Sequence, residues 1–269
     1  MHIVEKFVSG KKNDPNLCED AIIVSDHFIA VIDGATDKTG KQYNGVTGGK
    51  FATQTIANKI EKISPKICAF EAFELLTNAF TQSISRDALG CGNGPSASVT
   101  IYSRSRREIW QVGDVSYTPV GVSLRAPTSF PIDEIASRVR SFYTKKYLAD
   151  NVSAEVLRIT DPGRAKILPL LREQWRFSNT IGRWGFGTVN GNSIPSQLIS
   201  VNAIESDVKE MIIYTDGFPL PCRTLETAEQ NLQHLLVEDP LCISALRSTK
   251  SWNPLHCSYD DRAYVRFQL

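Results

Sequence analysis

Strand-like and helix-like runs arrive in pairs along this chain, and that order restricts the fold more than any other feature. Two apolar runs, at 21–24 and 28–32, flank the turn "SDH", and two amphipathic runs follow at 52–63 and 70–84. Parallel strands are usually joined by single helices, so paired helices favour antiparallel sheets covered by helical hairpins. The sequence therefore predicts an α+β fold, a four-layer α-β-β-α sandwich of two antiparallel sheets flanked by helix pairs.

The second half of the chain continues this order with longer irregular stretches. Asp239-Pro240 is typical of a helix start, with Asp as the cap and Pro at the first helical position. We find no repeat or linker, so a single domain is predicted over residues 1–269, with an irregular flap region at about 122–195. The further expected elements are strands at 96–102, 108–115, 210–217 and 261–267 and helices at 132–148, 163–176, 224–236 and 240–248.

The charge balance and the cysteine pattern exclude several classes of protein. Thirty basic and 29 acidic residues give a formal charge of +1, which offers no field to attract nucleic acid or an anionic membrane. No apolar run is long enough to span a bilayer, and the start "MHIVEKFVSG" lacks the apolar core of a signal peptide, so a cytoplasmic location is expected. The six cysteines contain no C-x-x-C pair and the four histidines are scattered, which predicts free thiols and no zinc site.

Acidic residues stand at the ends of four predicted strands. In antiparallel neighbours the C-terminal end of one strand lies beside the N-terminal end of the next, so the four acidic positions can gather on one rim of a sheet. An Asp-Gly step is also ordinary turn chemistry at a strand end, and that alternative stays open. The strands "FIAVIDG" and "MIIYTDG" run onto Asp33 and Asp216, while Glu19-Asp20 and Asp260-Asp261 directly precede "AIIV" and "RAYVRF".

Carboxylates packed so closely repel one another, and a bound divalent cation is the usual resolution. Ligands that are all oxygen, without His or Cys, favour Mg²⁺ or Mn²⁺ over zinc or copper. The rim holds more carboxylates than one ion needs, which suggests two ions.

Five motifs, in order, resemble those of the metal-dependent protein phosphatase family, type 2C: "CED", "VIDG", "PSASVTIY…EIWQVGD", "YTDG" and "DDRAYVRF". The resemblance runs from about residue 18 to residue 267. It implies the same α-β-β-α sandwich and the hydrolysis of phosphoserine and phosphothreonine with two Mn²⁺ or Mg²⁺ ions. It also implies that a water bridging the two ions is the nucleophile, so that no side-chain nucleophile is needed.

The resemblance also implies roles for individual residues. Asp33 and Asp216 would be the central catalytic carboxylates, with Asp33 bridging both ions and the Gly34 carbonyl binding one. Asp216 and Asp260 would hold the first ion. Glu19 would hold the second ion, with Asp20 acting directly or through water.

This sequence departs from the family pattern around the expected proton donor and phosphate ligand. Many members have His shortly after the first Asp-Gly, where this chain has "ATD" at 35–37. Pro15 stands about where a phosphate-binding arginine is expected, and only Lys11 and Lys12 lie nearby. Lys12 is therefore the candidate phosphate ligand, and the alternative is a solvated loop lysine.

A third metal and the flap offer two further hypotheses. Leu220 replaces the aspartate that often serves a third ion, so such an ion would use Asp114 and Asp216; alternatively, Asp114 is a plain turn residue. In the flap "SNTIGRWGFGTVNGNSIP", Arg183 or Trp184 would touch substrate, unless Trp184 packs in the core.

The leading functional hypothesis is a Mn²⁺- or Mg²⁺-dependent phosphatase with a phosphoprotein substrate and no nucleic-acid or membrane partner. Two alternatives stay open. One is a non-catalytic domain of this fold that binds partners or a regulator, and the other is a phosphatase that acts on a small molecule.

Overall fold

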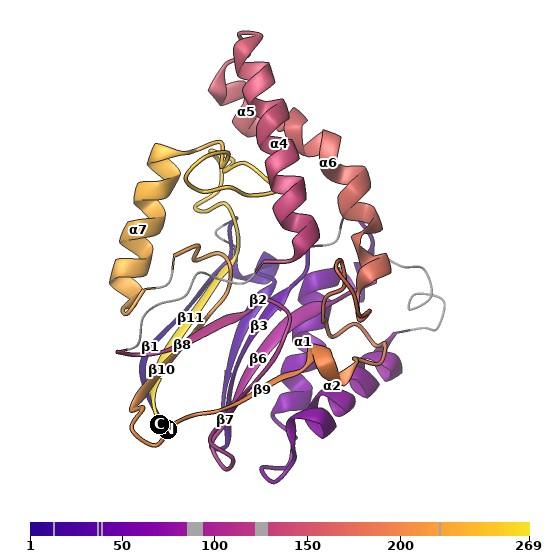
Figure 1. The fold of residues 1–269 in the computed structure, drawn as a ribbon, viewed down its shortest axis with the longest axis vertical. Helices are drawn as coiled ribbons and strands as arrows, with labels where there is room; N and C mark the ends of the chain where they lie inside the picture. Colours follow the sequence, from indigo (N-terminus) through magenta and orange to yellow (C-terminus); the bar gives the residue numbers. More distant parts are fainter. Residues whose placement is uncertain (13, 37, 39, 85–93, 122–128, 221) are drawn as a thin grey trace.

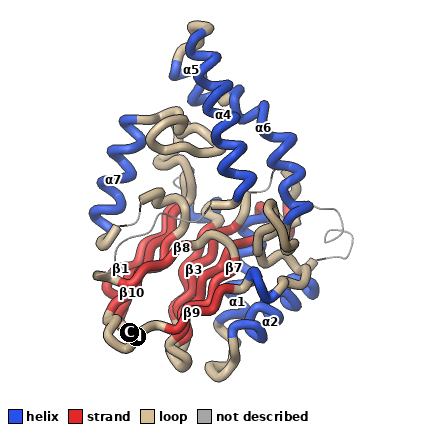
Figure 2. Tube along the Cα trace, viewed as in Figure 1, coloured by secondary structure: helices blue, strands red, loops and turns tan. Residues whose placement is uncertain are grey.

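Two antiparallel β-sheets face each other in the computed structural model, which describes residues 1–12, 14–36, 38, 40–84, 94–121, 129–220 and 222–269 (Figures 1 and 2). The first sheet has the strand order β1-β11-β10-β8, with β1 at His2–Ser9, β11 at Arg262–Gln268, β10 at Glu210–Tyr214 and β8 at Ser116–Pro119. The second has the order β2-β3-β6-β7-β9, with β2 at Asp20–Val24, β3 at Phe28–Gly34, β6 at Ala97–Ser103, β7 at Glu108–Val112 and β9 at Ser200–Ala203.

Strand β3 is apolar without interruption because both of its faces are buried. Ile29 and Val31 belong to the core between the two sheets, together with Phe267 of β11. The alternate residues, Ala30 and Ile32, belong to the core beneath the helices. The run "FIAVI" therefore crosses the middle of the fold and carries Asp33 to its edge.

Helices cover the outer faces of both sheets, which confirms the predicted four-layer sandwich. Helices α1 (Gly48–Ile60) and α2 (Ala69–Ser83) pack on the five-stranded sheet through one apolar cluster, and a small hairpin of β4 (Gln42–Tyr43) and β5 (Val46–Thr47) precedes them. Helix α7 (Leu225–Glu238) packs on the four-stranded sheet, where Ala228 joins a cluster with Ile212 and Tyr264.

Three helices extend beyond the sheets as a helical arm (Figure 1): α4 (Pro131–Ala149), α5 (Ala154–Thr160) and α6 (Pro162–Glu173). Ala136 of α4 packs against Ile167 and Leu171 of α6. The sequence predicted α4 and α6 but not the seven-residue α5. The short 3₁₀ helices η1 (Pro15–Leu17), η2 (Gln174–Phe177) and η3 (Ser196–Leu198) complete the described elements.

The prediction of a helix at 240–248 is wrong, because this segment is an irregular loop. The Asp239 carboxylate does accept backbone N–H groups, as a helix cap would, but it accepts three of them between residues 243 and 246. The buried Arg140 of α4 donates to three backbone carbonyls between residues 241 and 248. Side chains therefore satisfy the backbone groups that a helix would have paired with each other.

Five of the six cysteines lie in the described part of the chain. Cys18, Cys68, Cys222, Cys242 and Cys257 are free thiols, while Cys91 lies outside the described residues. Asp37 and residues 122–128 of the predicted flap region also lie outside them. Within the described residues, no helix is both long and apolar enough to cross a bilayer.

Candidate active site

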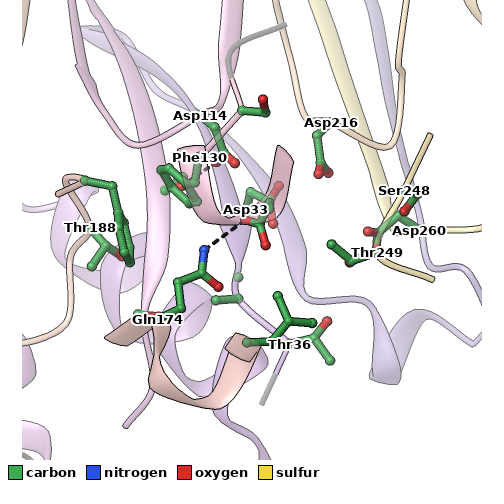
Figure 3. A pocket seen from close by; sticks show the side chains of 18 of the residues that line it. Asp33, Thr36, Asp114, Phe130, Gln174, Thr188, Asp216, Ser248, Thr249 and Asp260 are labelled. Atoms are coloured by element: carbon green, nitrogen blue, oxygen red, sulfur yellow. Dashed lines mark hydrogen bonds between the residues drawn. The ribbon is translucent and has the colours of Figure 1, made fainter. Parts of the chain in front are cut away.

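The predicted convergence of acidic residues occurs at one rim of the two sheets. Asp20 and Asp33 lie directly opposite each other in the β2–β3 ladder. Asp216 follows the end of β10, and Asp260 precedes the start of β11. These four residues and Asp114 line one cavity of about 550 Å³ (Figure 3).

The helical arm and the flap region build the other walls of this cavity (Figure 3). Gln174, just after α6, donates a 3.0 Å hydrogen bond to Asp133 of α4, which is the dashed line in the figure. Phe130 and Thr188 lie on the same side, and the segment 248–250 lies on the opposite side. The described part of the region at about 122–195, which was predicted to be irregular, therefore forms part of the cavity wall.

Gly34 and Glu19 stand where the end of β3 meets the start of α1. Gly34 has no room for a side chain, because a Cβ would collide with the carbonyl of Gly49. The Glu19 carboxylate accepts hydrogen bonds from Thr36 Oγ1 at 2.7 Å and Thr47 Oγ1 at 2.6 Å. Glu19 is thus buried beside α1 and is not among the cavity-lining residues, whereas Gly34 is.

Besides Asp133 of α4, whose pKa is raised by burial, four of the cavity's carboxyl groups have raised pKa values. Burial raises the pKa of Asp20 and of Asp33, and neighbouring carboxylates raise both further. Burial also raises the pKa of Asp114 to about 6, although Ser98 donates a 2.6 Å hydrogen bond to it. The pKa of Asp216 is raised because the surrounding protein reduces its hydration and because Asp260 repels its charge. Its side chain nevertheless has an exposed surface that faces the cavity. Ionising all four groups would therefore place more negative charge in this part of the site than the protein compensates.

Asp260 differs from these four because two lysines pair with it. Lys11 Nζ lies 3.1 Å from one carboxylate oxygen, and Lys250 forms a close ion pair with the other. Burial acts to raise the pKa of Asp260, but the two ammonium groups outweigh it and hold the pKa below its usual range. The neighbouring Asp261 accepts the Lys11 backbone N–H at 2.7 Å and lies 3.4 Å from Lys11 Nζ.

The lysine that reaches the site is Lys11, while Lys12 is exposed and does not line the cavity. A strand assignment for β1 would have distinguished Lys11 from Lys12, but β1 was not predicted from the sequence. Ser9, at the end of β1, pairs with Arg262, at the start of β11. That register brings the residues after Ser9 beside those before Arg262, and so brings Lys11 to Asp260.

Arg164 and Lys250 are further cations that the sequence analysis missed, and both line the cavity. Arg164 comes from α6 and donates to the Thr249 carbonyl at 2.8 Å. Its remaining guanidinium nitrogens have no hydrogen-bond partner among the described residues. Of the two flap residues expected to touch substrate, Arg183 is exposed and stacks on Trp184 at 4.8 Å, and neither lines the cavity.

A divalent metal suits only one side of this cavity. The donors are oxygen atoms, and burial and neighbouring carboxylates raise the pKa of Asp33 and Asp216, although Lys250 acts in the opposite direction on Asp216. Their uncompensated charge fits a cation such as Mn²⁺ or Mg²⁺. However, no three Asp, Glu, His or Cys side chains converge closely enough to hold an ion within the described ranges, and lysines already stand at Asp260.

Comparisons with known proteins identify the fold. A bacterial serine phosphatase has a TM-score of 0.50 at 11% identity, covering 99% of this chain and 98% of that chain. The Mycobacterium tuberculosis serine/threonine phosphatase PstP/Ppp gives 0.49 at 12% identity, covering 98% and 97% of the two chains. The Ser-Thr phosphatase MsPP of Mycobacterium smegmatis gives 0.48 at 12% identity and covers both chains fully.

No protein-family model and no curated protein sequence matches this chain. The structural likeness shows that the chain has the fold of the bacterial serine phosphatase over nearly its full length. The fold implied by the resemblance to metal-dependent protein phosphatases is thereby confirmed.

Proposed function

We propose that this chain is a Mn²⁺- or Mg²⁺-dependent phosphomonoester hydrolase that acts on phosphoserine and phosphothreonine in proteins. The observation that carries the proposal is the cavity at the sheet rim, where burial and the mutual repulsion of carboxylates raise the pKa of Asp20, Asp33, Asp114 and Asp216. The shared fold supports it, because the serine phosphatase of that fold matches the chain from end to end.

In this proposal, Asp33, Asp216 and the Gly34 carbonyl hold a divalent ion, and Asp20 and Asp114 add negative charge around it. A bound ion of this kind lowers the pKa of a coordinated water and neutralises phosphoryl oxygens. The residues themselves fix the ion's place, since Asp33 ends a strand that is buried on both faces. Thr215 donates a 2.7 Å hydrogen bond to Asp20 and orients that carboxylate.

Arg164 is the group that we assign to the substrate phosphate in place of Lys12. It lines the cavity, one of its terminal nitrogens is fixed by Thr249, and the others are free to donate to phosphoryl oxygens. Arginine suits this role because its planar fork can bind two phosphate oxygens at once. A cavity of about 550 Å³ has room for a phosphorylated side chain.

The non-catalytic alternative has one observation in its favour, the pairing of Asp260 with two lysines. A purified-protein assay separates the two functions. We expect hydrolysis of an aryl phosphate and of phosphoserine and phosphothreonine peptides with millimolar Mn²⁺, and none with EDTA or in the Asp33→Asn variant. A folded protein that binds Mn²⁺ and hydrolyses none of these substrates would favour the binding domain. Turnover of the aryl phosphate without turnover of any peptide would favour a small-molecule phosphatase.

A further inference from the structure

Two lysines from opposite ends of the chain meet at the acidic pair that precedes β11. Lys11 Nζ lies 3.1 Å from Asp260, 3.4 Å from Asp261 and 3.9 Å from Glu19. Lys250 pairs with the other oxygen of Asp260. Two ammonium groups therefore face three carboxylates, so that most of the negative charge in this corner of the cavity is compensated.

Two backbone hydrogen bonds hold Lys11 in place. The Lys11 N–H donates to Asp261 at 2.7 Å, and its carbonyl accepts the Cys257 N–H at 3.0 Å. The side chain is only 14% exposed. The backbone of Lys11 is thus held on both sides, which places the side chain beside Asp260.

The helical arm fixes Lys250 in turn. The backbone N–H of Ser251 donates to Asp161 at 2.8 Å, and the carbonyl of Thr249 accepts from Arg164 at 2.8 Å. The carbonyl of Ser248 accepts from the buried Arg140 at 3.2 Å. Three backbone groups on either side of Lys250 are held by α4, by α6 and by the Asp161 that joins α5 to α6.

A metal ion bound by Asp260 would have to share that carboxylate with two like charges in direct contact, whereas Lys250 acts on Asp216 only from beyond ion-pair distance. We propose that Lys11 and Lys250 take the place of one of the two metal ions, so that the site binds a single divalent ion on the Asp33–Asp216 side. This inference rests on the proposed metal dependence. It assigns the two lysines as positioning residues that hold Asp260 away from the ion.

The test is the number of Mn²⁺ ions bound per chain, measured by equilibrium dialysis and elemental analysis and needing no activity. We expect one ion in the wild type and two in the Lys11→Met/Lys250→Met double variant. Lys12→Met is the matched control, because Lys12 is exposed and adjacent, and it should keep one ion. The Lys11→Arg/Lys250→Arg variant keeps both charges and should also keep one.

A second measurement covers the case in which the double Met variant fails to fold. Asp260→Asn should leave the count at one ion at saturating Mn²⁺, because Asp260 is not a ligand, although the affinity falls as the nearby negative charge is lost. Two ions in the wild type, or no bound ion in Asp260→Asn at saturating Mn²⁺, would overturn the inference and leave the proposed function standing. Absence of Mn²⁺ binding in every variant would overturn both.

Discussion

Asp33 links the fold to the chemistry through a single carboxyl group. It ends a strand that is buried on both faces, pairs across the ladder with Asp20 and lies in the same cavity as Asp216. Burial and these neighbours raise its pKa, because each neighbouring carboxylate makes ionisation less favourable. The folded protein without metal therefore holds a local electrostatic cost that a divalent ion would remove.

The sign of these shifts predicts how the stability of the metal-free protein depends on pH. A carboxyl group whose pKa is higher in the folded state binds more protons when folded, so the free energy of unfolding falls as the pH rises through the window between the two values. For the pKa of Asp114 this window runs from the ordinary value of 3.8 to about 6, and the pKa values of Asp20, Asp33 and Asp216 are shifted in the same direction. We expect the melting temperature in EDTA to fall by several degrees between about pH 5 and pH 8.

The control for this prediction is Asp33→Asn, which removes one of the repelling charges. At about pH 8 in EDTA we expect the variant to melt above the wild type, yet to lose most of the rise that millimolar Mn²⁺ gives the wild type. Asp260 does not affect this window, because its pKa is lowered and its contribution is lost only at more acidic pH. A wild-type melting temperature that rises with pH in EDTA would contradict the argument.

Arg164 gives a kinetic prediction at the same scale. Replacing it with Met removes a charge-assisted hydrogen bond to the substrate, worth about 1.5–3 kcal/mol, or roughly 10- to 100-fold in kcat/KM. We expect most of the loss in KM for an aryl phosphate, with Arg164→Lys retaining part of the affinity. Arg172→Met, at an exposed position of the same helix, is the matched control. Equal kinetics in Arg164→Met and the wild type would remove Arg164 from the site.

At the scale of elements, the arm and the loop 239–251 form one unit around Arg140. Its side chain is fully buried, pairs with Asp161 at 3.0 Å and donates to backbone carbonyls of the loop. Arg140 therefore determines the conformation of a segment about one hundred residues away. The sequence predicts a helix there because Asp239-Pro240 is a helix-start motif that can be read locally. The Arg140 guanidinium that binds the loop carbonyls comes from α4, so the local sequence gives no sign of it.

Arg140→Met should destabilise the whole protein, because it leaves a carboxylate and three carbonyls without their buried partner. The expected loss is about 3–5 kcal/mol, or roughly 10 °C in melting temperature. Arg138→Met is the matched control: that side chain is 63% exposed and forms a surface ion pair with Glu134, so a change below about 1 kcal/mol is expected. Thermal unfolding of both variants measures the difference, and equal melting temperatures would refute the role of Arg140.

The flap offers a prediction about substrate size. Its inner part is structural, since Val189 is buried and exchanges two 3.0 Å backbone hydrogen bonds with Ala97 of β6. Its tip is exposed at Ile181 and Arg183, while Phe186 lines the cavity. We expect Ile181→Ala/Arg183→Ala to lower kcat/KM for phosphopeptides several-fold and to leave an aryl phosphate unchanged. Equal losses on both substrates would mean that the tip only supports the fold.

For the molecule as a whole, the sequence predicted the two sheets and the acidic rim because both depend on local patterns. Alternating or continuous apolar runs reveal buried strands, and antiparallel pairing then places their ends together. The edge strands β1, β8 and β9 were missed because they are short or half exposed and carry a weaker pattern. The cations were missed for a different reason: Lys11, Arg164 and Lys250 reach the cavity through tertiary contacts that no local pattern records.

The complete cavity predicts which phosphate esters are hydrolysed best. Ala35 follows Gly34 where a histidine could have served as a proton donor, and the next residue, Thr36, donates to Glu19 at 2.7 Å. An alkoxide that leaves phosphoserine needs a proton far more than a nitrophenolate does. We expect kcat/KM with Mn²⁺ to be at least about tenfold higher for p-nitrophenyl phosphate than for phosphoserine peptides, and to depend steeply on leaving-group pKa across a series of aryl phosphates.

The same assay separates this chemistry from other phosphatase mechanisms. Asp216→Asn should lower turnover of every ester by several orders of magnitude, because it removes a negative ligand from the proposed ion. Replacing the cysteines with serine should change stability and leave turnover of the folded fraction intact, since the free thiols Cys18 and Cys242 are buried and burial raises the pKa of each. A flat dependence on leaving-group pKa would require a proton donor in the cavity. Turnover in EDTA, or full activity of Asp216→Asn, would contradict the role of the carboxylate rim itself.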